Sequence, residues 1–107
     1  MSDDALLHTW PRGNSFKLRC PKLTDPAGAE VTDGAGTCTV YRQDGVTKLA
    51  SFDAAALTSE GSLYYLSVTP AMADEGIDGE LVKVVFVVTS PTKGTLRRTR
   101  RSRVVEP

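Results

Sequence analysis

From Ser15 onward, apolar residues recur at every second position in short runs, and turn-forming residues separate the runs. In FKLRC, Phe16, Leu18 and Cys20 alternate with two basic residues, which is the pattern of a strand with one buried face. Further strand-like runs follow as TCTVYR, LYYLSVTP, LVKVVFVVTSP and TLRRTRRSRVV. No segment has the length and period of a long helix, so we expect an all-β fold.

The number and spacing of these runs favour one fold class. About six or seven strands, with turn signals roughly every eight to twelve residues, predict an immunoglobulin-like antiparallel β-sandwich. A small β-barrel is the alternative. The length of 107 residues suits one domain, which we place at residues 15–107, after an N-terminal arm at residues 1–14. The near-continuous apolar run LVKVVFVVTSP predicts a central strand that is buried on both faces.

Two intermediate segments carry more specific predictions. Asp44-Gly45 separates TCTVYR from VTKLASF, and this order predicts a hairpin with a type I′ turn, in which both central residues have positive φ. Cys38 and Val40 are expected to face inward together. The segment DAAALTSEGS is either a short helical turn or a strand that fades into a loop.

The N-terminal arm contains three large apolar side chains in a segment too short to fold alone. These are Leu6, Leu7 and Trp10. Ser2 could cap a short helical turn that includes Leu6 and Leu7, and Pro11 would end it. The three apolar side chains either cover one end of the core or anchor the protein to a neighbouring subunit, and we take them as candidate partner-binding residues.

The closing segment is rich in arginine. Its arginines are Arg97, Arg98, Arg100, Arg101 and Arg103. In a strand they would occupy both faces, and an unpaired buried arginine is costly, so the segment must form an edge strand or meet solvent or a partner. Residues 1–94 hold eight basic and twelve acidic residues, whereas residues 95–107 hold five arginines and one glutamate. The arginines could protect a sheet edge, bind an acidic protein or bind nucleic acid.

No recognisable catalytic, metal-binding or cofactor motif is found in the sequence. The single histidine, His8, lies in the arm, and neither a nucleophile elbow nor a phosphate-binding loop is present. We therefore expect a protein that is not an enzyme and has no cofactor or metal. The spacing of Cys20 and Cys38 matches no zinc site, and the pair forms either a disulfide or two buried thiols. No apolar run is long enough for a membrane helix, and Asp3 and Asp4 do not suit a signal peptide.

The order of segments from residue 38 to residue 105 resembles that of small Ig-like proteins encoded among the head and neck genes of tailed bacteriophages. The resemblance lies in TVYRQDGVTKLASF, the strand LYYLSVTP, the Val-rich strand, the tight turn and the arginine-bearing last strand. It implies a virion structural protein at the head surface, as in capsid decoration, at the head–tail connection, or in the tail. Such a protein would be made and assembled in the host bacterial cytoplasm.

The resemblance also implies partners. These would be other virion proteins and copies of the same chain in a symmetric assembly, bound through the arm and the arginine-rich strand. Two other functions stay open: a carbohydrate- or cell-binding module, in which exposed tyrosines stack on sugars, and an adaptor that contacts DNA.

Overall fold

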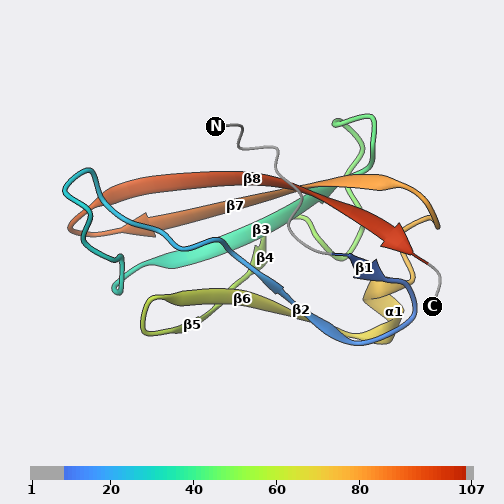
Figure 1. The fold of residues 1–107 in the computed structure, drawn as a ribbon, viewed down its shortest axis with the longest axis horizontal. Coiled ribbons are helices and arrows are strands. Elements are labelled where there is room, and N and C mark those ends of the chain that lie inside the picture. Colours follow the sequence, from blue (N-terminus) through green and yellow to red (C-terminus); the bar gives the residue numbers. More distant parts are fainter. Residues whose placement is uncertain (1–8, 106–107) are drawn as a thin grey trace.

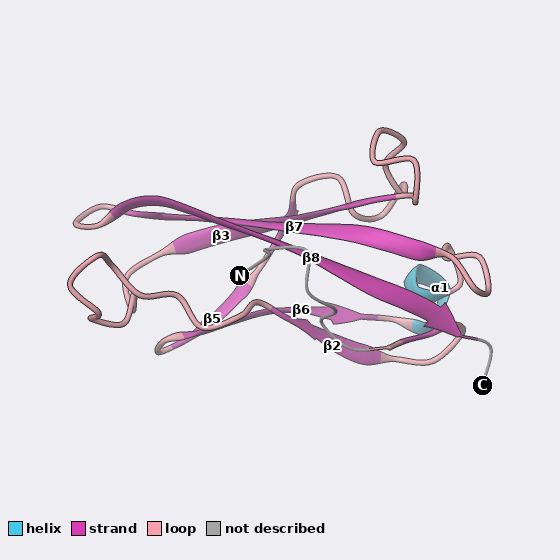
Figure 2. Ribbon diagram, turned by 45° about the horizontal axis from the view of Figure 1, so that its top comes forward, coloured by secondary structure: helices cyan, strands magenta, loops and turns pink. Residues whose placement is uncertain are grey.

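The computed structural model describes residues 9–105, which form two β-sheets packed face to face (Figures 1 and 2). The five-stranded sheet has the order β1-β8-β7-β3-β4, and the three-stranded sheet has the order β2-β6-β5. The strands are β1 (Trp10–Pro11), β2 (Phe16–Arg19), β3 (Ala35–Tyr41), β4 (Ala55–Ala56), β5 (Thr58–Glu60), β6 (Leu63–Val68), β7 (Leu81–Ser90) and β8 (Gly94–Val105). The predicted sandwich is therefore confirmed, rather than the alternative barrel.

The strand order is that of an immunoglobulin-like domain. Strands β3, β7 and β8 correspond to C, F and G, β4 corresponds to C′, and β2, β6 and β5 correspond to B, E and D. One pair departs from the expected antiparallel arrangement, because β1 runs parallel to β8. Short strand β1 therefore joins the sheet beside the far end of β8, as Figure 1 shows.

Strand β7 is the central strand that the sequence predicts. It lies between β8 and β3 and pairs antiparallel with both. Its inward side chains, including Val84 and Phe86, are buried in the core. On the opposite face Val85 is only 6% exposed. The inner side chains are buried along the strand, whereas on the outer face burial is limited to Val85, so the prediction of burial on both faces holds only at the centre of β7.

The Asp44-Gly45 hairpin forms, but not with a type I′ turn. Only Gly45 has positive φ (77°), and Arg42 donates its N–H to Thr47 O at 2.7 Å, which closes a longer loop. The Asp44 carboxylate accepts the N–H groups of Val46 and Thr47 at 2.8 and 2.9 Å. This side chain organises the loop from within, so Asp44 keeps a negative φ and the type I′ prediction is wrong.

The second half of that hairpin is shorter than expected. In place of a strand through VTKLASF, a single bridge joins Tyr41 to Lys48. The alanine-rich segment that follows forms β4 and β5, so the strand alternative for DAAALTSEGS is the correct one. The one described helix, α1 (Pro70–Ala73), follows β6 and begins where Thr69 accepts the N–H of Met72 at 3.3 Å.

Trp10 lies at the centre of one end of the core. Its side chain is 0% exposed, and its ring meets Phe16 and Phe52 edge-on, with centroids 5.2 and 5.1 Å apart. The indole N–H donates to Ala73 O at 2.8 Å. The prediction that Trp10 binds a partner is therefore wrong, because its apolar ring and its polar N–H are both satisfied inside the domain. Leu6 and Leu7 lie outside the described residues.

The folded domain begins before residue 15. Because β1 is part of the five-stranded sheet, Trp10 and Pro11 of the predicted arm belong to the domain. Strand β2 behaves as predicted, with Leu18 buried and Lys17 and Arg19 exposed.

A second, smaller core cluster at the other end contains Val31 and Tyr64, and the Tyr64 hydroxyl donates to Val31 O at 3.0 Å.

Candidate docking surface

The outer face of the five-stranded sheet carries a group of basic side chains. From β8, this face receives the side chains of Arg97, Arg101 and Arg103. Arg101 lies opposite Lys83 of β7. Cross-strand partners share one face of a sheet, so Lys83 belongs to the same group. We call Lys83, Arg97, Arg101 and Arg103 the basic face. Val85 lies near its middle, where the neighbouring side chains leave it 6% exposed.

No acidic residue interrupts the basic face. The three long strands of this sheet, β3, β7 and β8, contain neither aspartate nor glutamate. Tyr41 of β3 lies beside Lys83, whose Nζ is 5.7 Å from the centre of the tyrosine ring. The face therefore combines positive charge, one aromatic ring and the apolar side chains of Val85 and Val87.

The remaining two arginines of β8 lie on its inner face. Arg98 and Arg100 share this face with Ser102 and Val104, both 0% exposed, but are themselves only half-buried. Burial raises the pKa of the Cys20 thiol, and the charges of Arg98 and Arg100 oppose that rise in part. As expected, the middle of β8 is not packed into a water-free core on either of its two faces.

The acidic residues are distributed differently from the arginines. Every aspartate and glutamate between residues 9 and 105 has a partner within the chain. These residues are Asp25, Glu30, Asp33, Asp44, Asp53, Glu60, Asp74, Glu75, Asp78 and Glu80. Some are ion pairs, such as Lys93 with Asp25 at 3.0 Å, whereas others cap loops, as Asp44 does.

The basic face does not share in this pairing. None of the ion pairs among residues 9–105 involves Arg97 or Arg101, and Arg103 donates to Gly79 O at 2.7 Å, a neutral acceptor. The carboxylates of the described domain are thus engaged, while the arginines of the face keep their charge for solvent ions or for another molecule.

Both cysteines are free thiols in the structure. Burial raises the pKa of Cys20 and of Cys38 to about 12. At neutral pH each is a protonated thiol, and a thiol is a weak nucleophile compared with its thiolate. Of the two alternatives for Cys20 and Cys38, the structure therefore has the two thiols and not the disulfide.

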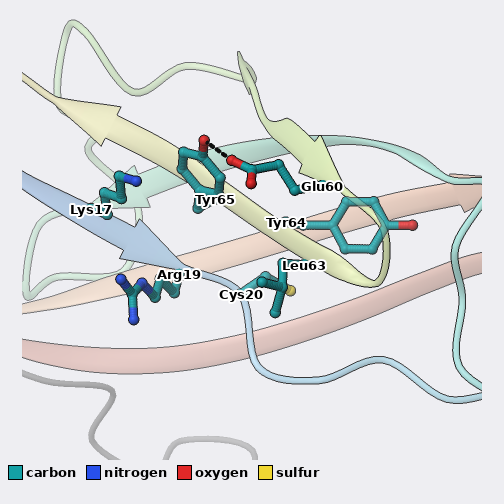
Figure 3. A pocket seen from close by; sticks show the side chains of 7 residues that line it. All are labelled: Lys17, Arg19, Cys20, Glu60, Leu63, Tyr64 and Tyr65. Carbon is teal, nitrogen blue, oxygen red and sulfur yellow. Dashed lines mark hydrogen bonds between the residues drawn. The ribbon is translucent and has the colours of Figure 1, made fainter.

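A shallow hollow of about 230 Å³ lies on the three-stranded sheet (Figure 3). Lys17 Nζ lies 4.6 Å from the centre of the Tyr65 ring, and the Tyr65 hydroxyl donates to Glu60, which raises the pKa of Tyr65. The ring is thus held in place and covered on one side. The hollow is also lined by Arg19, Cys20, Leu63 and Tyr64, of which Leu63 is 64% exposed.

The sequence analysis did not identify two features of these surfaces. Lys83 is the one basic residue of β7, and its outward position follows from strand alternation, which could have revealed it. The hollow depends on the pairing of β2 with β6, which places Arg19 opposite Tyr65. No local signal predicts that pairing, because the two segments are far apart in the chain.

Comparison with known proteins gives no relative: no protein-family model, no curated protein and no solved structure matches this chain. Within residues 9–105, no three side chains of the kinds that hold metal ions lie together. The described part of the chain has no helix with the length and apolar character needed to cross a membrane.

Proposed function

We propose that this protein is a non-enzymatic structural protein that docks on an acidic protein surface through its basic face. The observation that carries the proposal is the contrast in pairing: the described carboxylates have partners within the chain, whereas Arg97 and Arg101 have none among them. The face carries arginine and tyrosine, which are enriched in protein interfaces, beside apolar valine.

The setting we propose is the virion of a tailed bacteriophage, at the head surface, the neck or the tail. The Ig-like strand order supports this setting only as a fold suited to docking in many copies, and the resemblance in segment order supports the family. In this setting the acidic surface belongs to a neighbouring virion protein. A second copy of the chain is the less suitable partner, because its described carboxylates are already engaged.

The test is binding to the purified head, neck and tail proteins of the same genome, measured by size analysis and calorimetry. The variant Arg97→Gln/Arg101→Gln should weaken binding at least tenfold, since arginines in interfaces often contribute more than about 1 kcal/mol each. The matched control, Lys17→Gln/Arg19→Gln, removes the same charge from the opposite sheet and should leave binding unchanged. Equal losses in both variants would show that only net charge matters.

Nucleic acid is the competing ligand for a basic face. Duplex DNA is therefore tested with the same two variants at low and moderate salt. Binding to DNA that falls steeply with salt and is lost in Arg97→Gln/Arg101→Gln would favour a DNA-contacting adaptor over the docking protein.

The carbohydrate-binding alternative has less structural support. Of the three tyrosines, Tyr64 is buried, and a lysine ammonium lies over the ring of each of the other two. A sugar that stacks on Tyr65 or Tyr41 would have to use the other side of the ring or displace the lysine. A glycan screen that gives binding lost in Tyr65→Ala would restore this alternative.

A further inference from the structure

Strand β8 has a long open edge. On one side it pairs with β7 from Gly94 to Arg103, but on the other side β1 covers only Val104 and Val105. From Thr95 to Arg103, no strand among residues 9–105 pairs with this side. An edge of this length presents unpaired backbone N–H and C=O groups, to which a strand of another molecule can add.

The hydrogen bonds at the end of β8 show which backbone groups point to the open edge. Val104 directs its N–H and C=O to Glu80 and Gly79, on the β7 side, at 2.8 and 2.7 Å. Val105 O accepts the N–H of Arg12 at 2.9 Å, on the β1 side. Because successive residues of a strand alternate in this respect, the odd-numbered residues direct their backbone groups to the open edge.

Two of these edge carbonyls are already occupied by arginine side chains. Arg98 Nη1 donates to Arg97 O at 2.9 Å, and Arg100 Nη1 donates to Thr99 O at 2.8 Å. Both side chains start on the inner face and reach around the strand to the edge. An incoming strand would have to displace both guanidinium groups before its own N–H groups could reach these carbonyls.

Charge opposes the pairing of two copies at the same place. Five of the seven residues from 97 to 103 are arginine. If two β8 edges paired over this stretch, arginines would lie opposite or diagonal to arginines, and like charges directly opposite each other destabilise a sheet. The geometry of the guanidinium groups and their charge therefore act in the same direction.

We infer that Arg98 and Arg100 close the β8 edge against strand addition by a second copy of this chain. This role is separate from that of the basic face: the inward arginines keep the free protein from extending its sheet, and the outward arginines remain available to a partner. The inference does not depend on the proposed function, since it concerns the protein alone.

The experiment compares two double variants that remove equal charge from one strand. Arg98→Gln/Arg100→Gln opens the edge, whereas Arg97→Gln/Arg101→Gln leaves both edge carbonyls covered. Sedimentation at protein concentrations from about 1 μM to 1 mM should show self-association that is at least tenfold stronger in the first variant than in the second. Circular dichroism checks that both remain folded.

Each outcome decides the inference. Self-association of the edge variant alone supports it, particularly if N-methylated peptides of the β8 sequence, which cannot donate along the strand, do not add to the edge while the unmodified peptide does. Equal self-association of both variants would overturn it, because charge alone would then keep copies apart. Monomeric behaviour of both would also overturn it. If the edge variant unfolds, Arg98→Gln and Arg100→Gln are compared singly in the same way.

Discussion

Trp10 and Val104 lie side by side as a parallel pair, and both side chains are completely buried. This pair attaches the segment that precedes β2 to the last strand of the chain. The Trp10 indole fills the space between Phe16 and Phe52 and reaches Ala73 O, so one side chain links both sheets and the connection that contains α1. The first and last described strands thus complete one end of the core together.

Replacing Trp10 with alanine should therefore destabilise the fold strongly. We expect a loss of about 3–5 kcal/mol in the free energy of unfolding, from lost burial and an unfilled cavity. Urea denaturation followed by circular dichroism measures it. Leu63→Ala, which removes an exposed side chain, is the control and should change stability by less than about 0.5 kcal/mol. A Trp10→Ala protein of normal stability would contradict the structural role of Trp10.

Gly36 of β3 should not tolerate a side chain. A Cβ atom at this position would lie 2.8 Å from Val88 Cγ2, 2.9 Å from Leu57 Cδ1 and 3.1 Å from Val87 O. Because the last atom belongs to the backbone, Gly36→Ala is expected to cost about 1–3 kcal/mol. Thermal unfolding compares it with Ala35→Ser at the exposed neighbouring position. A melting temperature of Gly36→Ala equal to that of the control would contradict this packing.

Ala54 should be improved by glycine. It has a φ of 54°, the only positive φ of a non-glycine residue among those described, and this conformation is unfavourable for an L-residue with a Cβ. Relief of this strain exceeds the entropic cost of glycine, so Ala54→Gly should raise stability by up to about 1 kcal/mol. Ala56→Gly, in β4, should lower stability by roughly 0.5–1 kcal/mol. Equal destabilisation by both changes would show that Ala54 is unstrained.

Because of the two thiols, the free energy of unfolding should decrease at alkaline pH. The pKa of each is raised to about 12 in the fold, against an ordinary value of 9.0. Above pH 9 the unfolded chain loses these protons while the folded chain keeps them, so stability is complete below pH 9 and falls as the pH rises toward 12. Urea denaturation at pH 7 and pH 10 measures the fall, which should be smaller in Cys38→Ala. If stability falls by the same amount between pH 7 and pH 10 in Cys38→Ala as in the original protein, the raised pKa of Cys38 is contradicted.

The sequence was informative where structure depends on neighbours in the chain. The alternation in FKLRC predicted the buried and exposed sides of β2, and the apolar run through Val85 predicted the central strand. The arginines of β8 could be assigned to a border of the sheet, because burial of unpaired guanidinium groups is too costly. These inferences need only the period of a strand and the cost of burying charge.

The tertiary structure decided what depends on residues distant in the chain. The sequence of the N-terminal segment leaves Trp10 equally suited to a partner or to the core, and only the parallel pairing with Val104 places it inside. The Asp44 loop shows a related limit, because its carboxylate competes for the same amides that a regular turn would use. The tertiary structure also separates the arginines of the basic face from Arg98 and Arg100 at the edge of β8. This separation depends on which backbone carbonyls the neighbouring strands leave unpaired. Strand period is a local property, whereas pairing partners are chosen by the packing of the whole chain.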